Sequence, residues 1–264
     1  MEIVGYVLSV FIGLSLGLIG GGGSILTVPI LVYFFAIDPE LASAYSLFVV
    51  GLASSAGAVS HYRKGNVNLK IAAVLGLPSL VSVFTMRKWV MPAMPHHLIN
   101  IGHYEITKNI LIMLVFALLM LAASISMIRK GKSAEQIKEG CPVNYIKLIL
   151  QSVVVGIITG FVGVGGGFLI IPSLVLFAGL PMKKAVGTSL MVMAFSSLLG
   201  VMGDISRHAA INYSFLLIFT AFAIAGIIAG SYLSKHIKDT KLKPAFGWFV
   251  MLMGAFVLIG TLAK

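Results

Sequence analysis

Two runs of glycine are the residues whose type and spacing point most directly to chemistry. The first occupies positions 20–23 and is followed by Ser24; the second occupies positions 163–167, interrupted only by Val164. Each run precedes a short apolar segment, and the first turn of a helix presents unpaired N–H groups and roughly half a positive charge. Glycine lets a ligand approach such a backbone closely. We therefore predict that a small anionic substrate binds at seven positions: Gly21, Gly22, Gly23, Ser24, Gly165, Gly166 and Gly167.

Glycines also have a purely structural use in membrane proteins. Gly13, Gly17 and Gly20 have the spacing of small residues that let two helices pack closely, and we interpret these three as packing positions. The glycine run that follows them exceeds what helix packing requires, which favours a binding role for the run itself.

Hydroxyl side chains follow both runs, on the next long apolar segment of each half. They are Ser43, Tyr45, Ser46, Ser54, Ser55, Thr188, Ser189, Ser196 and Ser197. In hydrocarbon, a serine or threonine usually donates to the carbonyl one turn back, which is the alternative to substrate binding. We predict Ser46, Thr188 and Ser189 as substrate donors, because Ser46 and Ser189 fall at matched positions of the two halves.

Two ionisable residues lie at the ends of apolar segments, and we predict them as a candidate proton path. His61 titrates near physiological pH, and ionisable groups within membrane segments are functional candidates. Asp204 occupies the corresponding position in the second half. The alternative is that both side chains are hydrated at the membrane interface.

Other charged residues and the histidines give weaker indications of function. Arg87 and Lys88 adjoin Trp89 and are interpreted as interfacial anchors, with the alternative that they gather anions at an entrance. The spacing of His96, His97 and His103 matches no metal-site signature, so we predict neither a metal nor a cofactor. The sequence has no zinc-protease or phosphate-loop motif.

The amino-acid composition indicates the class of protein to which these residues belong. The chain has 264 residues, of which 59% are hydrophobic and 10% charged, with a mean hydropathy of +1.05. Soluble domains are about 25% charged, so we predict an integral membrane protein. The net charge of +11 comes from basic residues in short loops, as membrane topology requires, and we expect no nucleic-acid partner.

Ten apolar segments are predicted to be helical, because backbone in lipid must satisfy its own hydrogen bonds. They cover residues 3–20, 24–36, 41–62, 69–91, 107–128, 145–163, 167–179, 184–203, 212–235 and 244–262. We expect residues 3–20 to be retained rather than removed as a signal peptide. Segments 24–36 and 167–179 are too short to cross alone. Each therefore forms, with the segment before it, either two tilted spans or a re-entrant hairpin.

The orientation follows from the loop charges. All but five of the 19 Lys and Arg residues fall on one side of the ten-segment topology. Those five are Arg87, Lys88, Lys108, Arg207 and Lys264. Because cytoplasmic loops carry the excess of Lys and Arg, we predict a cytoplasmic (inner) membrane protein with both termini outside the cytoplasm.

The chain repeats itself with a shift of 143 residues. This shift places Gly13, Pro29 and Ser54 on Gly156, Pro172 and Ser197, and one inserted residue then brings Asn68 onto Asn212. We predict a first repeat at residues 1–128, a cytoplasmic linker at 129–144 and a second repeat at 145–264, within one transmembrane domain. Five segments in each half make the repeats inverted, an architecture typical of secondary transporters.

The glycine motifs resemble those of the TauE/SafE family. The resemblance rests on residues 17–29 (GLIGGGGSILTVP), residues 160–172 (GFVGVGGGFLIIP), residues 185–190 (AVGTSL) and residues 61–68 (HYRKGNVN). It implies a bacterial inner-membrane permease that moves sulfite or organosulfonates, with no enzymatic activity. The histidine-bearing loop 92–106 and residues 85–88 (TMRK) do not match the family's repeated motifs, so the resemblance leaves the substrate open.

The function that we predict is a secondary permease for small sulfur-containing anions that works by alternating access, with proton coupling as a further option. A passive anion channel is the alternative, separable by whether a pH gradient drives accumulation. An intramembrane enzyme would need a nucleophile, metal or carboxylate pair at membrane depth, and the sequence offers none. The expected partners are the anion, the lipid bilayer and, as an open option, further copies of the chain.

Overall fold

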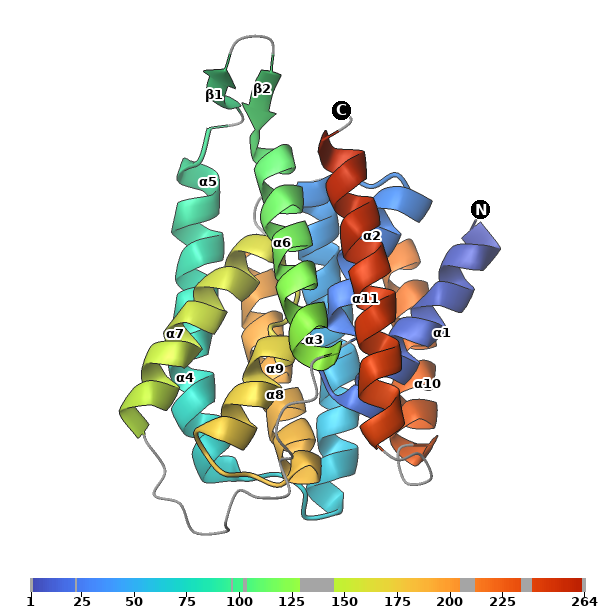
Figure 1. Cartoon of the computed structure of the whole chain (residues 1–264), viewed down its shortest axis with the longest axis vertical. Helices are drawn as coiled ribbons and strands as arrows, with labels where there is room; N and C mark the ends of the chain where they lie inside the picture. Colours follow the sequence, from blue (N-terminus) through green and yellow to red (C-terminus); the bar gives the residue numbers. More distant parts are fainter. Residues whose placement is uncertain are drawn as a thin grey trace.

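The computed structural model describes residues 2–21, 23–95, 97–101, 104–128, 145–204, 212–233 and 239–262. Of the predicted features, Gly22, His96, His103 and the linker 129–144 lie outside these residues. Within the described part, each of the ten predicted apolar segments contains a helix (Figure 1).

The first half of the chain begins with a broken helix pair. Its helices are α1 (Glu2–Ile19), α2 (Ser24–Phe34), α3 (Pro39–Arg63), α4 (Leu69–Thr85), the π-helix η1 (Met86–Val90), α5 (Met91–Ala93) and α6 (Lys108–Ile128). The second half follows the same order with α7 (Tyr145–Val162), α8 (Gly167–Leu176), α9 (Met182–Asp204), α10 (Tyr213–Leu233) and α11 (Asp239–Leu262). The start of α1 and the end of α11 lie at the same end of the bundle, which we call the terminal end (Figure 1).

A short β-hairpin projects from the terminal end, and the sequence analysis did not predict it. Strand β1 (His97–Ile101) pairs antiparallel with β2 (Tyr104–Thr107). These segments are rich in β-branched and aromatic residues, which favour strands. The prediction of an all-α membrane protein is therefore correct for the bundle and incomplete for this loop.

Six helices in the described part are long and apolar enough to cross a membrane. They are α3, the continuous helix from α4 to α5, α6 over Lys108–Ile125, α7, α9 and α10. Helices α2 and α8 have 11 and 10 residues. At about 1.5 Å per residue they reach roughly half of a ~30 Å hydrocarbon core. Neither can cross alone, as predicted.

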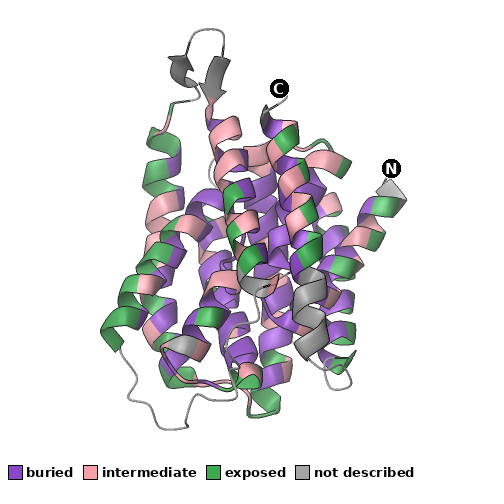
Figure 2. Cartoon of the chain, viewed as in Figure 1, coloured by how far each residue is buried: buried purple, intermediate pink, exposed green. Residues whose placement is uncertain are grey.

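Helices α3 and α9 form the centre of the bundle. In each, 72% of the most apolar 18-residue window is buried, against 33–44% in the other four spanning candidates. Helix pairs α1–α10, α4–α7 and α6–α11 pack around them, and exposed residues lie on the outer faces (Figure 2). Side chains such as Val81 and Leu150 are exposed there, which suits contact with lipid.

The glycines of α1 and α7 let these helices touch their neighbours backbone to backbone. A Cβ atom on Gly13 would lie 1.9 Å from the carbonyl oxygen of Ala223 in α10. On Gly156 it would lie 2.6 Å from the carbonyl oxygen of Ser79 in α4. Gly17 is equally confined, 2.4 Å from the Ile227 carbonyl oxygen. The packing interpretation of Gly13 and Gly17 is confirmed.

Replacing Gly13 by alanine is expected to destabilise the protein, because the added methyl group forces α1 away from α10. Overpacking of this kind typically costs about 1–3 kcal/mol. The measurement is the melting temperature of the purified protein in detergent. The matched control is Gly76→Ala in α4, whose Cβ would meet nothing closer than Val192 Cγ2 at 3.8 Å. An equal melting temperature for the two variants would contradict the packing assignment.

Candidate functional site

The two glycine runs meet at the centre of the molecule. A Cβ atom on Gly21 would lie 2.2 Å from the carbonyl carbon of Gly167, and a Cβ atom on Gly167 would lie 2.7 Å from Gly21 Cα. The break between α1 and α2 thus touches the break between α7 and α8. Two stretches of backbone, one from each half, are in contact with no side chain between them.

The backbone at the second break has conformations that suit glycine. Gly165 and Gly166 have φ angles of +72° and +69°, in the left-handed region. Gly166 is the N-cap of α8 and Gly23 is the N-cap of α2, and neither helix has a side-chain capping hydrogen bond. The third N–H of each helix, from Leu26 and Leu169, donates to the carbonyl of the N-cap glycine at 3.1 and 3.0 Å. The N–H groups of the first two residues of each helix are left for another acceptor. The Ser24 side chain forms a local hydrogen bond within the first break, because its Oγ donates to the Gly21 carbonyl at 2.8 Å.

Several buried hydroxyl groups have no hydrogen-bond partner among the described residues. They include Ser46 and Ser54 on α3, Ser197 on α9, and Thr159 on α7, whose Oγ1 lies 2.3 Å from the position that a Cβ on Gly166 would occupy. The predicted donor Ser189 takes the local alternative, since its Oγ donates to the Val186 carbonyl at 2.8 Å. The sequence match paired Ser46 with Ser189, but the matched pair that remains unbonded is Ser54 with Ser197.

The Ser197 hydroxyl lies beside the second glycine break. Its Oγ lies 3.3 Å from the position that a Cβ on Gly165 would occupy, and Val50 Cγ1 lies 2.6 Å from the same point. Met193, one turn earlier on α9, has its sulfur 2.2 Å from the corresponding point on Gly167. We call Gly21, Gly165–Gly167 and Ser197 the central site. It combines two uncapped helix N-termini with a buried hydroxyl group, which suits an acceptor of hydrogen bonds.

The two halves are also joined by a matched pair of hydrogen bonds. Asn68 N–H donates to the Thr188 hydroxyl at 3.1 Å, and Asn212 N–H donates to the Tyr45 hydroxyl at 2.8 Å. The side chains of Asn68 and Asn212 accept from the third residue of α4 and α10. Thr188, which we predicted as a substrate donor, therefore accepts a hydrogen bond here through its hydroxyl oxygen. The O–H hydrogen of Thr188 is not used in this bond. The repeat aligned Asn68 with Asn212 but did not reveal this role.

The terminal end contains a buried ion pair that the sequence analysis missed. Arg87 Nη1 lies 2.9 Å from Asp204 Oδ2, and the two side chains are 1% and 6% exposed. The interpretation of Arg87 as an interfacial anchor is wrong, because the guanidinium is enclosed by protein. Lys88 lies over the ring of Phe84, 5.2 Å from its centre. The sequence did contain one signal for this ion pair, namely the opposite charge of Asp204 at the end of another spanning segment.

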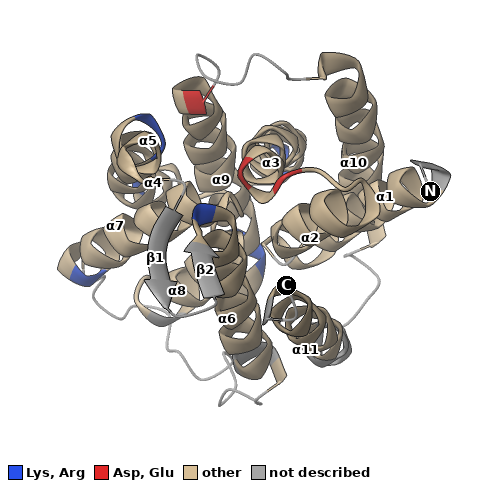
Figure 3. Ribbon diagram, turned by 90° about the horizontal axis from the view of Figure 1, so that it is seen from above, with Lys and Arg blue, Asp and Glu red and all other residues tan. Residues whose placement is uncertain are grey.

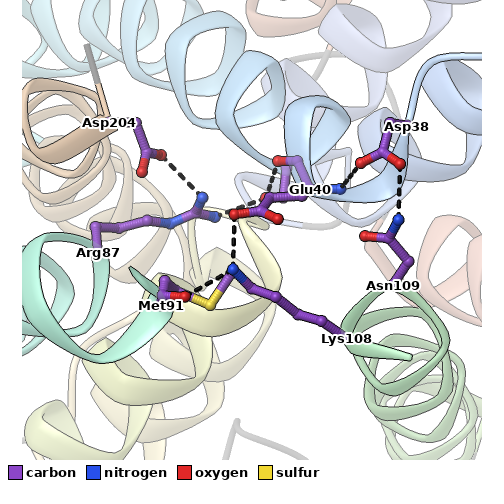
Figure 4. A network of polar contacts seen from close by, with 8 residues as sticks. Asp38, Glu40, Arg87, Met91, Lys108, Asn109 and Asp204 are labelled. Atoms are coloured by element: carbon purple, nitrogen blue, oxygen red, sulfur yellow. Dashed lines mark hydrogen bonds and ion pairs between the residues drawn. The ribbon is translucent and has the colours of Figure 1, made fainter. Parts of the chain in front are cut away.

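This ion pair belongs to a larger network at the terminal end (Figure 4). Arg87 Nη2 donates to Ser43 Oγ at 3.0 Å, and Ser43 Oγ donates to the Glu40 carbonyl at 2.7 Å. Lys108 donates to the Glu40 carboxylate at 2.7 Å and to the Met91 carbonyl at 2.6 Å. Viewed from this end, acidic residues at the start of α3 and the end of α9 stand among basic residues of η1 and α6 (Figure 3). The network ties α3, α5, α6, α9 and η1 together.

His61 and Asp204 lie near opposite ends of α9. A Cβ on Gly187, early in α9, would lie 2.9 Å from His61 Cβ, whereas Asp204 is the last residue of that helix. Seventeen residues of helix correspond to about 25 Å. His61 is buried, and neither ring nitrogen has a hydrogen-bond partner in the described part of the chain. The candidate proton path remains a prediction.

The helices and the central site define an integral membrane protein with a buried polar centre, an arrangement used to move solutes across a bilayer. The comparison with known families gives the narrower assignment. The chain belongs to the sulfite exporter TauE/SafE family, whose model matches residues 6–257. This confirms the resemblance seen in the glycine motifs.

Curated relatives agree with the family assignment. A probable membrane transporter protein of Xylella fastidiosa is 29% identical over 94% of this chain and 91% of its own length. One of Bacillus subtilis, YdhB, is 26% identical over 96% and 94%. One of Methanocaldococcus jannaschii is 27% identical over 97% and 94%. No solved structure matches the chain. The protein is a membrane transporter and not an enzyme.

The matched hydrogen bonds between the halves give a test of stability. Tyr45→Phe is expected to lower the melting temperature, because the Asn212 N–H loses its acceptor. A buried donor left without a partner costs about 1–3 kcal/mol. Tyr213→Phe is the control, since Tyr213 is 58% exposed. If both variants melt like the parent protein, the Tyr45 hydroxyl does not hold the halves together.

Proposed function

We propose that the protein is a secondary permease for small sulfur-containing anions, such as sulfite or organosulfonates, and that the anion binds at the central site. The contact between Gly21 and Gly167 carries the proposal, because it brings the first turns of α2 and α8 to one place. The family description names sulfite export, and the relatives are described as probable membrane transporters.

The donors at the central site match the chemistry of such an anion. A sulfite or sulfonate group presents three oxygen atoms that accept hydrogen bonds. Uncapped N–H groups of two helices, each with about half a positive charge at its N-terminus, supply donors and a favourable potential. The Ser197 hydroxyl is buried next to Gly165, has no hydrogen-bond partner among the described residues, and supplies another donor. Screening is weak at this depth, so the attraction is stronger than in water.

Alternating access between two inverted repeats is the mechanism that we infer. Helices α1 and α7, which begin the two halves, run in opposite directions (Figure 1). Equivalent positions make equivalent contacts: Gly13 meets Ala223 as Gly156 meets Ser79, and Asn68 meets Thr188 as Asn212 meets Tyr45. Reciprocal contacts between two equivalent halves support two states of similar energy, in which the site faces either side.

Proton coupling and orientation complete the proposal. His61 and Asp204, near the two ends of α9, are candidate proton-binding groups on opposite sides of the central site. The distribution of Lys and Arg supports a cytoplasmic membrane protein with the terminal end outside.

The direct test is flux into proteoliposomes. Sulfite or sulfoacetate is expected to accumulate above its external concentration when a pH gradient is imposed, and to equilibrate without one. Empty liposomes are the control. A passive channel would only equilibrate the anion under both conditions. Absence of flux of either anion in both conditions would refute the proposed substrate class.

The role of the buried hydroxyls is tested by neighbouring serines. Ser197→Ala is expected to weaken the apparent affinity for the transported anion about tenfold, since a hydrogen bond to a charged group contributes about 1.5–3 kcal/mol. Ser196→Ala is the matched control, because Ser196 Oγ donates locally to the Met193 carbonyl at 3.4 Å. The same comparison applies to Ser54→Ala, with Ser55→Ala as its control. The Ser55 hydroxyl donates to the Gly51 carbonyl. Equal affinities within each pair would exclude these hydroxyls from the site.

A further inference from the structure

The buried ion pair at the terminal end joins the two halves of the chain. Arg87 belongs to η1 in the first half, and Asp204 is the last residue of α9 in the second half. We propose that Arg87 and Asp204 form an ionic gate that keeps the terminal end closed and separates when that end opens. The proposal rests on the alternating-access mechanism inferred above and deepens it by naming how one end is controlled.

The ion pair lies above the central site on the same helix faces. Ser197 precedes Asp204 by seven residues on α9, and Val50 follows Ser43 by seven residues on α3. Residues seven apart share a helix face and are separated by about 10 Å. Ser197 and Val50 are the two side chains that adjoin Gly165. Any route that opened from the terminal end along these faces would pass the ion pair before it reached the glycine breaks.

The backbone that carries Arg87 is suited to a change of shape. Arg87 lies in the π-helix η1, between α4 and α5, and the Met91 N–H that ends it donates to the Met86 carbonyl. Short π-helical segments within α-helices occur frequently at functional sites. Gly203, next to Asp204, keeps the two segments close, since its Cβ would lie 3.1 Å from Arg87 Cβ. Arg87 thus has a local element that can shift its position relative to α9.

The positions of the other half that match Arg87 and Asp204 do not hold an ion pair. The repeat places Asp204 at the position of His61, and Arg87 at that of Ser231. Ser43, which accepts from Arg87, corresponds to Val186, and the nearby Glu40 corresponds to Lys183. Neither His61 nor Ser231 carries a permanent charge. The gate is therefore an addition to one end of a repeated scaffold, and it favours the state in which that end is closed.

Sided labelling of a thiol at the central site tests the gate without any substrate. The background is Cys141→Ser, which removes the chain's one cysteine, with Ser197→Cys as reporter. A membrane-impermeant methanethiosulfonate is applied to intact cells and, separately, to inside-out vesicles. The test variant combines Arg87→Gln with Asp204→Asn, which removes both charges and leaves no lone buried ion.

The neutral pair is expected to raise the labelling rate from the terminal side about tenfold and to lower it from the other side. A tenfold change corresponds to a shift of about 1.4 kcal/mol between the two states. Asn109→Ala is the matched control, because Asn109 donates to Asp38 in an exposed contact at the same end. This control should leave both rates unchanged. Arg87→Lys preserves the charge and should restore slow labelling from the terminal side, relative to Arg87→Gln alone.

Two results would overturn the gate. Faster labelling of the neutral pair from both sides, with a lower melting temperature, would show that the ion pair stabilises the fold and does not control access. Unchanged rates in the neutral pair would show that the ion pair does not control access. If the neutral pair cannot be produced, the labelling rates of Arg87→Lys and Arg87→Gln from the two sides are compared instead. Equal rates for these two variants would overturn the gate. Failure of sulfite flux would reject the proposed substrate and leave the labelling result standing.

Discussion

The arrangement depends on one constraint, which is that backbone polar groups inside a membrane need hydrogen-bond partners. Breaking two helices at the centre of the bundle exposes N–H and carbonyl groups, each of which costs several kcal/mol in hydrocarbon. The chain tolerates the breaks because Gly21 and Gly167 bring them together and α3 and α9 enclose them. Non-helical backbone at this depth is acceptable only where protein or a polar cavity surrounds it. The short helices α2 and α8 and the buried centre follow from this requirement.

The sequence predicted the helices and the breaks well because their signals are local. Apolar runs of fixed length identify membrane segments, and the confined glycines of α1 follow the spacing of small residues. The Arg87–Asp204 ion pair left no such local signal, since its members are 117 residues apart. A basic residue at the end of an apolar segment usually reaches the interface, so the sequence favoured that interpretation. Only the packing of η1 against α9 shows that the side chain points inward.

The hydroxyl groups show a second limit of sequence reasoning. The repeat identified Ser46 and Ser189 as matched positions, yet one has no partner in the described residues and the other bonds its own helix. Whether a serine donates to its own helix depends on its χ1 rotamer and on its neighbours, which the residue type does not specify. Tyr45 and Thr188 illustrate the converse, because two different hydroxyls accept equivalent bonds from Asn212 and Asn68. A repeat therefore predicts equivalent positions better than equivalent partners.

The differences between the halves are as informative as their similarity. The glycine breaks and the asparagine caps recur in both halves, so they belong to the scaffold that each state of the proposed cycle needs. The charges do not recur: Arg87 and Lys108 are buried against Asp204 and Glu40 at the terminal end and do not act as loop charges. Identical halves would give two states of equal energy and no preferred resting state. A small set of unmatched ion pairs is sufficient to set that preference, because a bias of about 1.4 kcal/mol changes the ratio of states tenfold.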